Sequence, residues 1–250
     1  MTATEPENRP GEHLLDALAA ARLNSSPWPH AYLEQTLTPS FAAGLARSFH
    51  GFRLERCAEN EREKTYRFGT SRLDALPPDE LPDARWAELV SVLGGREYRD
   101  ALARLSRTPL DGAEFTLSVW EYQDGDWLAP HVDKADKLVT QIFYLTEEWE
   151  PGDGGRLLIL DEPRGPALAA YAPRAGASAV LPRSERSWHA VERPARGSAP
   201  RLSVTATYWR PDATGPGGHG AGNAATGTGM GMGMETGMSM KATETETDGG

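Results

Sequence analysis

The spacing of hydrophobic residues changes near the middle of the chain. Four segments in the first half place apolar side chains three and four residues apart, which is typical of amphipathic helices: 13–23, 39–49, 83–93 and 96–105. From residue 114 onward, short runs rich in β-branched and aromatic residues are bounded by Gly, Pro and Asp: 114–122, 138–146, 155–160, 177–182, 187–193 and 201–209. The pattern predicts helices followed by strands, and it does not fit alternating strand–helix units.

Short strands that follow a helical segment predict an α+β protein. We expect a double-stranded β-helix (jelly-roll) core over residues 114–211, with the N-terminal helices of residues 13–107 packed on one sheet. Residues 13–211 are predicted to form a single domain, because a chain of 250 residues that is 39% hydrophobic supplies one sizeable core. Residues 1–12 are polar and are predicted to be a disordered lead-in.

Residues 212–250 differ in composition from the rest of the chain. This segment holds 12 of the 26 glycines and five of the six methionines, and its only aliphatic side chains are alanines. It cannot bury enough apolar surface to offset its ordering entropy, so we predict a disordered tail rich in Gly, Met and Thr. Methionine thioethers are soft ligands that suit Cu(I), but nothing in the segment fixes a coordination geometry.

Charge and cysteine content narrow the range of partners. The 26 basic and 36 acidic residues give a net charge of −10 without a long basic run, so a nucleic-acid partner is not expected. Cys57 is the only cysteine, which excludes an intrachain disulfide and a thiolate metal cage. The N-terminus lacks the apolar core of a signal peptide, and no run reaches the ~20 apolar residues of a membrane helix. We therefore expect a cytoplasmic protein without a membrane partner; the oligomeric state stays open.

The segment WLAPHVD, residues 127–133, places an imidazole and a carboxylate two positions apart. Residues i and i+2 share a face of a strand, so His131 and Asp133 are expected to point into the barrel. His189 lies in a later predicted strand. Two histidines and one carboxylate are the ligand set that holds non-haem Fe(II) with open coordination positions. Alternatively, His131 and Asp133 bond to each other, and His189 is a core histidine bonded to a carbonyl.

Arg201 begins a predicted strand that has one polar face. The alternate residues of this strand are hydroxylic: Ser203, Thr205 and Thr207. A polar face inside a barrel needs a polar ligand or water, and the planar guanidinium suits a carboxylate. Tyr144, in the predicted strand 138–146, offers a phenol to the same anion. The alternative for Arg201 is a surface salt bridge.

Together these segments resemble the Fe(II)/2-oxoglutarate-dependent oxygenases, and within them the prolyl-hydroxylase-like branch. Residues 27–49 are similar to the family's entry segment, residues 119–160 to its first strands, and residues 187–209 to its closing motif. The resemblance implies that three residues are iron ligands: His131, Asp133 and His189. It also implies a set of residues around the 2-oxoglutarate, with Arg201 on the distal carboxylate: Arg201, Tyr144, Ser203 and Tyr122.

The resemblance implies a dioxygenase that uses Fe(II), 2-oxoglutarate and O2, hydroxylates an unactivated C–H bond and releases succinate and CO2. Halogenating relatives carry a small residue where this chain has Asp133, which favours hydroxylation. Nucleic-acid demethylating relatives carry a second arginine shortly after the first, and this chain has none between Arg201 and Arg210.

The expected substrate is a small molecule, either an amino acid or a biosynthetic intermediate, because no peptide-binding extension is evident. Four residues are expected to flank the mouth of the site, as substrate readers or as a solvated rim: Trp127, Trp188, Arg183 and Arg186. The alternatives are a protein prolyl hydroxylase, a non-catalytic jelly-roll binding module, and a cupin-like metal enzyme that does not use 2-oxoglutarate.

Overall fold

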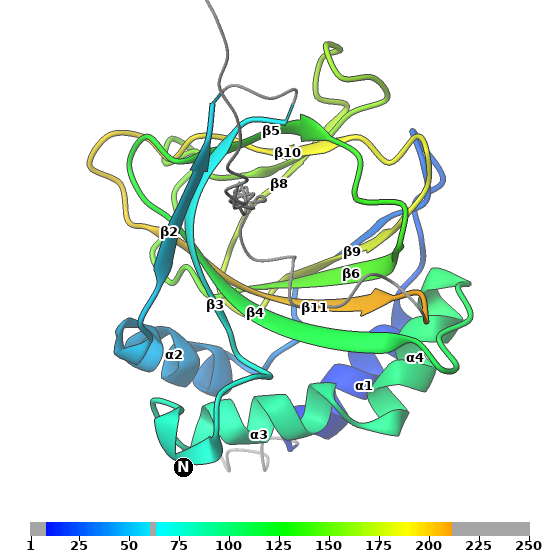
Figure 1. The fold of residues 1–250 in the computed structure, drawn as a ribbon, viewed down its shortest axis with the longest axis vertical. Helices are drawn as coiled ribbons and strands as arrows, with labels where there is room; N and C mark the ends of the chain where they lie inside the picture. The colour runs from blue at the N-terminus through cyan, green and yellow to red at the C-terminus, as the bar shows by residue number, and fades with distance from the viewer. Residues whose placement is uncertain (1–8, 61–63, 212–250) are drawn as a thin grey trace, which may run out of the picture.

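The computed structural model describes residues 9–60 and 64–211, which begin with a helix and end with a strand of a barrel (Figure 1). The helices are α1 Pro10–Ala20, α2 Pro39–Ser48, α3 Ala84–Leu93 and α4 Arg96–Ser106, with 3₁₀ turns at Phe49–Gly51 and Pro78–Glu80. Each α-helix overlaps a segment of predicted helical periodicity: α2, α3 and α4 match to within one residue at each end, and α1 lies three residues earlier than predicted. None of the described helices is both long and apolar enough to cross a membrane.

The lead-in predicted for residues 1–12 is too long. Helix α1 already begins at Pro10, because proline is favoured in the first turn, where its missing N–H is not needed. Residues 1–8 and the predicted tail, 212–250, lie outside the described residues.

The strands of the described chain form one antiparallel sheet that curls into a nearly closed barrel. They are β1 Ala31–Leu33, β2 Glu55–Glu59, β3 Tyr66–Arg72, β4 Glu114–Tyr122, β5 Trp127–His131, β6 Lys137–Tyr144, β7 Leu157–Ile159, β8 Ala169–Tyr171, β9 Ser178–Pro182, β10 His189–Val191 and β11 Arg201–Trp209. Their order is β1-β9-β6-β11-β4-β3-β5-β10-β7-β8, and β2 pairs with β3. The predicted jelly-roll core is confirmed.

Three strands lie in the segment that was predicted to be mostly helical, residues 13–107. Strands β2 and β3 carry glutamate, arginine and glycine, so neither shows a clean alternation of polar and apolar residues. They form because β3 pairs with β4 and β5, which extends the sheet. Strand β1 forms in the same way, on the edge offered by β9. These pairings join residues that are distant in sequence, and local periodicity does not report them.

The helices cover the outer face of the sheet formed by β4, β11 and β6, while β5 and β10 lie on the opposite side of the barrel (Figure 1). Alternate residues of β4 and β11 pack into the same core as Trp86 of α3: Leu117, Val119, Leu202, Val204 and Ala206. Residues between them line a cavity inside the barrel, and five of these are hydroxylic: Thr116, Ser118, Ser203, Thr205 and Thr207. Because successive residues of a strand point to opposite faces, each strand has an apolar face toward the helices and a polar face toward the cavity.

A chain of buried hydrogen bonds joins α4 to the sheet. The Tyr98 hydroxyl donates to Oε1 of Gln141 at 3.0 Å, and Nε2 of Gln141 donates to Oγ of Ser178 at 3.0 Å. The hydroxyls of Ser178 and Thr36 share a further hydrogen bond at 2.6 Å. All four residues are buried, so each polar atom depends on its protein partner instead of water.

Tyr98→Phe is expected to lower the free energy of unfolding by about 1–3 kcal/mol, because it leaves the buried Oε1 of Gln141 without its donor. Urea denaturation measures this change. Tyr208→Phe is the matched control: the Tyr208 hydroxyl has no hydrogen bond to a described residue, so its loss should cost less than about 0.5 kcal/mol. Equal stability of the two variants would contradict the role given to the buried chain.

Candidate active site

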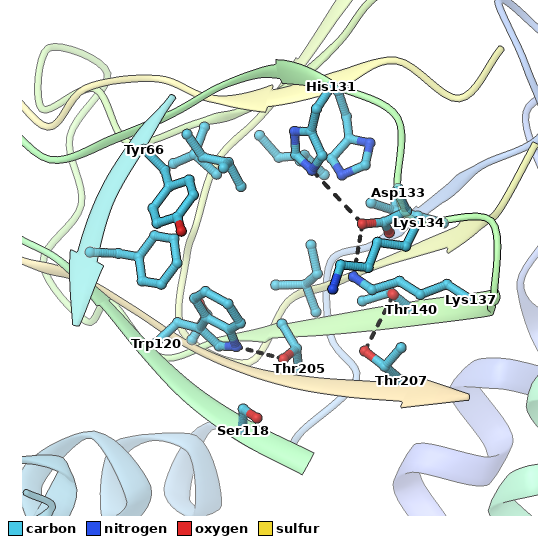
Figure 2. Close-up of a pocket in the computed structure, with 18 of the residues that line it drawn as sticks. Tyr66, Ser118, Trp120, His131, Asp133, Lys134, Lys137, Thr140, Thr205 and Thr207 are labelled. Atoms are coloured by element: carbon cyan, nitrogen blue, oxygen red, sulfur yellow. Dashed lines mark hydrogen bonds and ion pairs between the residues drawn. The ribbon is translucent and has the colours of Figure 1, made fainter. Parts of the chain in front are cut away.

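A cavity of about 400 Å³ lies between the two sides of the barrel. Its floor comes from β4, β6 and β11, its roof from β5 and β10, and one wall from β3. This volume is within the range of small-molecule sites in proteins. Figure 2 shows side chains that line the cavity and point toward its centre.

His131, Asp133 and His189 meet at the roof of this cavity. His131 is the last residue of β5 and lies opposite His189, the first residue of β10, in the antiparallel register. Their ring centroids are 4.3 Å apart, and one ligand atom from each of the three residues lies within 4.8 Å of the others. Asp133 follows β5 and does not belong to it, so the expected shared strand face is replaced by the bend after the strand. All three side chains are buried.

Hydrogen bonds to carbonyls fix the orientation of both imidazoles. Nδ1 of His131 donates to the carbonyl of Ala129 at 2.9 Å, and Nδ1 of His189 donates to that of Ser187 at 2.9 Å. This tautomer leaves a lone pair on Nε2 of each ring. Burial lowers the pKa of both imidazoles, so both are neutral at pH 7. Two neutral nitrogen donors therefore face one point in the cavity.

Asp133 is ionised in spite of its burial. Burial by itself raises the pKa of the carboxyl group, but the nearby cations, above all the ammonium of Lys137, outweigh it and hold the pKa well below its usual range. Nζ of Lys137 donates to Oδ1 of Asp133 at 2.8 Å, and this same oxygen lies 3.8 Å from Nε2 of His131 (Figure 2). A charged carboxylate beside two imidazole lone pairs is a donor set for a divalent metal.

Arg201 is a buried cation without an acidic partner among the described residues. The residue is 3% exposed, Nη1 donates to Oγ of Ser203 at 3.2 Å, and Nε has no acceptor among the described residues. The guanidinium lies 4.9 Å from the ring centre of Tyr122 and 5.2 Å from that of Tyr144. A buried, uncompensated charge is costly, so this arrangement calls for an anion from outside the chain.

Strand register brings the residues around Arg201 together. Tyr122 of β4 lies opposite Arg201, and Tyr144 of β6 lies opposite Ser203. Burial raises the pKa of both phenols, and Arg201 opposes this shift, so both keep their protons at neutral pH. The buried Tyr144 hydroxyl has no partner of hydrogen-bond geometry among the described residues. It is therefore a free donor beside the free donor of the guanidinium.

A comparison with protein families identifies the barrel. Residues 117–209, which contain the three clustered ligand residues and Arg201, match the model of the 2OG-Fe(II) oxygenase superfamily. The match spans strands β4 to β11. The resemblance inferred from the sequence is thereby confirmed.

Solved 2OG-Fe(II) oxygenase-type structures share the fold at low sequence identity. A prolyl-4-hydroxylase from Pseudomonas putida has a TM-score of 0.55 and 21% identity, over 81% of this chain and 100% of the other. A 2OG-Fe(II) oxygenase family oxidoreductase from Burkholderia pseudomallei has a TM-score of 0.54 and 15% identity, over 83% and 94%. A Trichoplax adhaerens prolyl hydroxylase, solved with a hypoxia inducible factor peptide fragment, has a TM-score of 0.53 and 13% identity, over 80% and 88%. No curated protein matches the chain.

The cofactors of the 2OG-Fe(II) oxygenases are Fe(II), 2-oxoglutarate and O2, and the cavity fits the first two. Two neutral imidazoles and one carboxylate suit Fe(II) and leave coordination positions open. The unpartnered donors of Arg201 and Tyr144 suit a carboxylate. The two histidines and Asp133 therefore suit the metal ion of the family, and Arg201 and Tyr144 suit a carboxylate of its co-substrate.

The four residues expected at the mouth do not line the cavity. Nε1 of Trp127 donates to Thr65 at 3.1 Å, and the ring lies under the Arg193 guanidinium at 4.0 Å, so this tryptophan packs outside the barrel. Nε of Arg183 donates at 3.3 Å to the backbone carbonyl of Asp133, where it supports the bend. Strict alternation would place Trp127 on the same face of β5 as His131, but the pairing of β5 with β10 shifts register between Leu128 and His131, and Leu128 lines the cavity instead.

Sequence reasoning missed a set of cavity residues: Lys64, Tyr66, Phe68, Trp120, Lys134 and Lys137. Trp120 lies in a correctly predicted strand, and the run HVDKADK places two lysines directly after the ligand pair, so the sequence held a signal for these three. The residues from β3 and just before it had no such signal, because that strand was not predicted. Their position depends on the pairing of β3 with β4 and β5.

Proposed function

We propose that this chain is an Fe(II)- and 2-oxoglutarate-dependent dioxygenase that hydroxylates an unactivated C–H bond of a small molecule. One observation carries the proposal: a cluster of three metal-type donors and an uncompensated buried guanidinium are built into one barrel. Neither group alone specifies the reaction. Together they match the two cofactors that the superfamily uses.

The proposed roles follow from the contacts of each side chain. His131, Asp133 and His189 hold Fe(II), and Lys137 fixes the orientation of the carboxylate. Arg201 binds the distal carboxylate of 2-oxoglutarate through its planar fork, with hydroxyl donors from Tyr144 and Ser203, while Tyr122 lines the co-substrate pocket. When bound, the iron and the 2-oxoglutarate supply O2 activation, with release of succinate and CO2.

Apolar side chains limit the access of water to the metal donors. The cavity wall beside the two histidines contains a group of aliphatic residues: Leu128, Ile142, Leu157, Leu181 and Val191. A site with few competing water molecules strengthens the electrostatic interactions of its charged groups and suppresses side reactions. The side chains of the protein therefore bind and orient the two cofactors and exclude water from the metal donors.

A protein prolyl hydroxylase is the second candidate, and a specific observation favours it. The prolyl hydroxylases from Pseudomonas putida and Trichoplax adhaerens share the fold, and the latter was solved with a peptide fragment. Aromatic surfaces bind proline-rich segments, and Tyr66, Phe68 and Trp120 form such a surface in the cavity. A non-catalytic binding module is disfavoured because the donors of both cofactors are intact.

Succinate release tests the proposal. The full-length chain is incubated with Fe(II), 2-oxoglutarate and O2 while amino acids, fractionated small molecules of a cell extract and proline-rich peptides are added in turn. We expect stimulation by a small molecule, and mass spectrometry of that molecule should show one added oxygen atom. Stimulation by peptides alone would favour the prolyl hydroxylase. Absence of succinate together with absence of 2-oxoglutarate binding would favour the non-catalytic module.

A further inference from the structure

Lysine is rare in this chain and is concentrated at one place. Of the 26 basic residues only four are lysines: Lys64, Lys134, Lys137 and Lys241. The first three line the cavity described above, and Lys241 lies outside the described residues. All other basic side chains of the described chain are arginines. Among the described residues, lysines therefore occur only at the cavity.

The three lysines come from two sides of the cavity. Lys134 and Lys137 follow Asp133 and extend into the cavity from its side, as Figure 2 shows. Lys64 precedes β3, and its amine is close enough to interact electrostatically with Asp133, Lys137 and Lys134. Lys64 forms no hydrogen bond and no ion pair with any described residue. Three ammonium groups thus gather around one part of the cavity, and among the described residues Lys64 has no ion-pair partner.

Lys64 is charged at neutral pH in this setting. Burial and the ammonium groups of Lys137 and Lys134 lower its pKa to about 8, and Asp133 opposes this shift. The Lys64 side chain is exposed, so water screens part of the effect of burial.

The charge of the cavity is opposite to that of the chain. The chain has a net charge of −10, yet among the described residues five cationic and two acidic side chains line the cavity: Lys64, Arg72, Lys134, Lys137 and Arg201 against Glu59 and Asp133. Asp74 compensates Arg72, with Nε 2.9 Å from Oδ1. Fe(II) and the 2-oxoglutarate dianion bring no net charge together. The positive excess therefore persists after both cofactors bind, and an anionic occupant would balance it.

An aromatic surface faces Lys134 and Lys137 across the cavity. The rings of Tyr66 and Phe68 stack at 5.0 Å, and Trp120 meets Phe68 edge-on at 4.6 Å. In Figure 2, Tyr66 and Trp120 lie on one side of the open space, and Lys134 and Lys137 lie on the other. A molecule that fills the cavity then meets apolar ring surface at one end and ammonium groups at the other.

We propose that the substrate is a small organic anion, with a carboxylate or phosphate bound by Lys64 and Lys134 and an apolar part packed against Tyr66, Phe68 and Trp120. This inference rests on the proposed function, because it takes the cavity beside the metal ligands as the substrate site. Lysine suits this task because its ammonium is a compact charge on a flexible stem, which adapts to an anion that arrives and leaves.

Binding of matched acid and amide probes tests the substrate class. The full-length protein is loaded with Fe(II) and saturating 2-oxoglutarate under argon, so that no turnover occurs and the Arg201 position is filled. Isothermal titration calorimetry compares phenylacetate with phenylacetamide, indole-3-acetate with indole-3-acetamide, and phenyl phosphate with the carboxylates. We expect the anions to bind more tightly than the amides. Whichever binds more tightly, phenyl phosphate or the carboxylates, then identifies the anionic group of the substrate.

Variants of Lys64 assign the effect to this side chain. Lys64→Gln should weaken binding of the anionic probes about tenfold, the effect of one charge-assisted hydrogen bond, and should leave the amides unchanged. Lys64→Arg should retain most of the affinity because it keeps the positive charge. Arg96→Gln is the control for net charge: it removes one cation whose side chain is 83% exposed on α4, outside the cavity, and should change nothing.

The two proposals fail in different ways. If 2-oxoglutarate binds but acids bind no better than amides, or if Lys64→Gln has no effect, the substrate class is overturned and the proposed function stands. If 2-oxoglutarate does not bind but the preference for anions persists and depends on Lys64, the proposed function fails and the anion site stands. An acid preference that Lys64→Gln removes and Lys64→Arg restores supports the inference.

Discussion

Asp133→Ala is expected to abolish succinate formation, because it removes the only carboxylate from the proposed iron ligands. Two imidazoles would remain, and the Fe(II) affinity should fall by more than the ~10–100-fold that loss of a residue supporting a ligand costs. Anaerobic titration with Fe(II) measures the affinity, and the succinate assay measures turnover. The fold should survive, because Asp133 lies after the end of β5 and its hydrogen-bond partner Lys137 is part-exposed and can be rehydrated.

Asp124→Ala is the matched control for this prediction. Asp124 is an exposed acid in the turn before β5, and it does not line the cavity. Its removal changes the net charge by the same amount and should leave metal binding and turnover as in the wild type. Circular dichroism and a thermal melt would show whether both variants are folded. Full hydroxylase activity of a folded Asp133→Ala protein would refute the assignment of the metal ligands.

Replacement of Arg201 should act on 2-oxoglutarate and spare the iron. Arg201→Lys keeps the charge but loses the bidentate fork, so the apparent KM for 2-oxoglutarate should rise about tenfold to a hundredfold, which corresponds to ~1.5–3 kcal/mol. Arg201→Ala should raise it further, because only the hydroxyls of Tyr144 and Ser203 would then face the carboxylate. Initial rates at varied 2-oxoglutarate give the KM, and anaerobic titration gives the Fe(II) affinity, which should hardly change.

Arg72→Lys is the matched control within the same cavity. Arg72 also lines the cavity, but Asp74 binds its guanidinium, so the same substitution should leave the KM for 2-oxoglutarate unchanged. A wild-type response to 2-oxoglutarate in both Arg201 variants would show that this guanidinium does not bind the co-substrate. In that case the proposed reaction has no binding residue for 2-oxoglutarate, even if iron binding is confirmed.

The sequence by itself determined the parts of this protein that depend on local periodicity. All four α-helices lie where apolar residues recur at three- and four-residue spacing, and β4 and β11 have the predicted bounds. These elements are long enough for one period to appear several times. The resemblance to the 2OG-Fe(II) oxygenases rested on residues of these strands and of the segment around His131 and His189, and the family match confirms it.

Only the tertiary structure decided which side chains share the cavity. Strands β2 and β3 form by pairing with distant partners, and β3 brings Tyr66 and Phe68 to the site. The position of Lys64, which directly precedes β3 and lines the cavity, also depends on that pairing. Trp127 is only four residues from His131, yet it packs outside the barrel. Proximity in sequence does not specify the direction of a side chain, because strand register and the closure of the barrel set it.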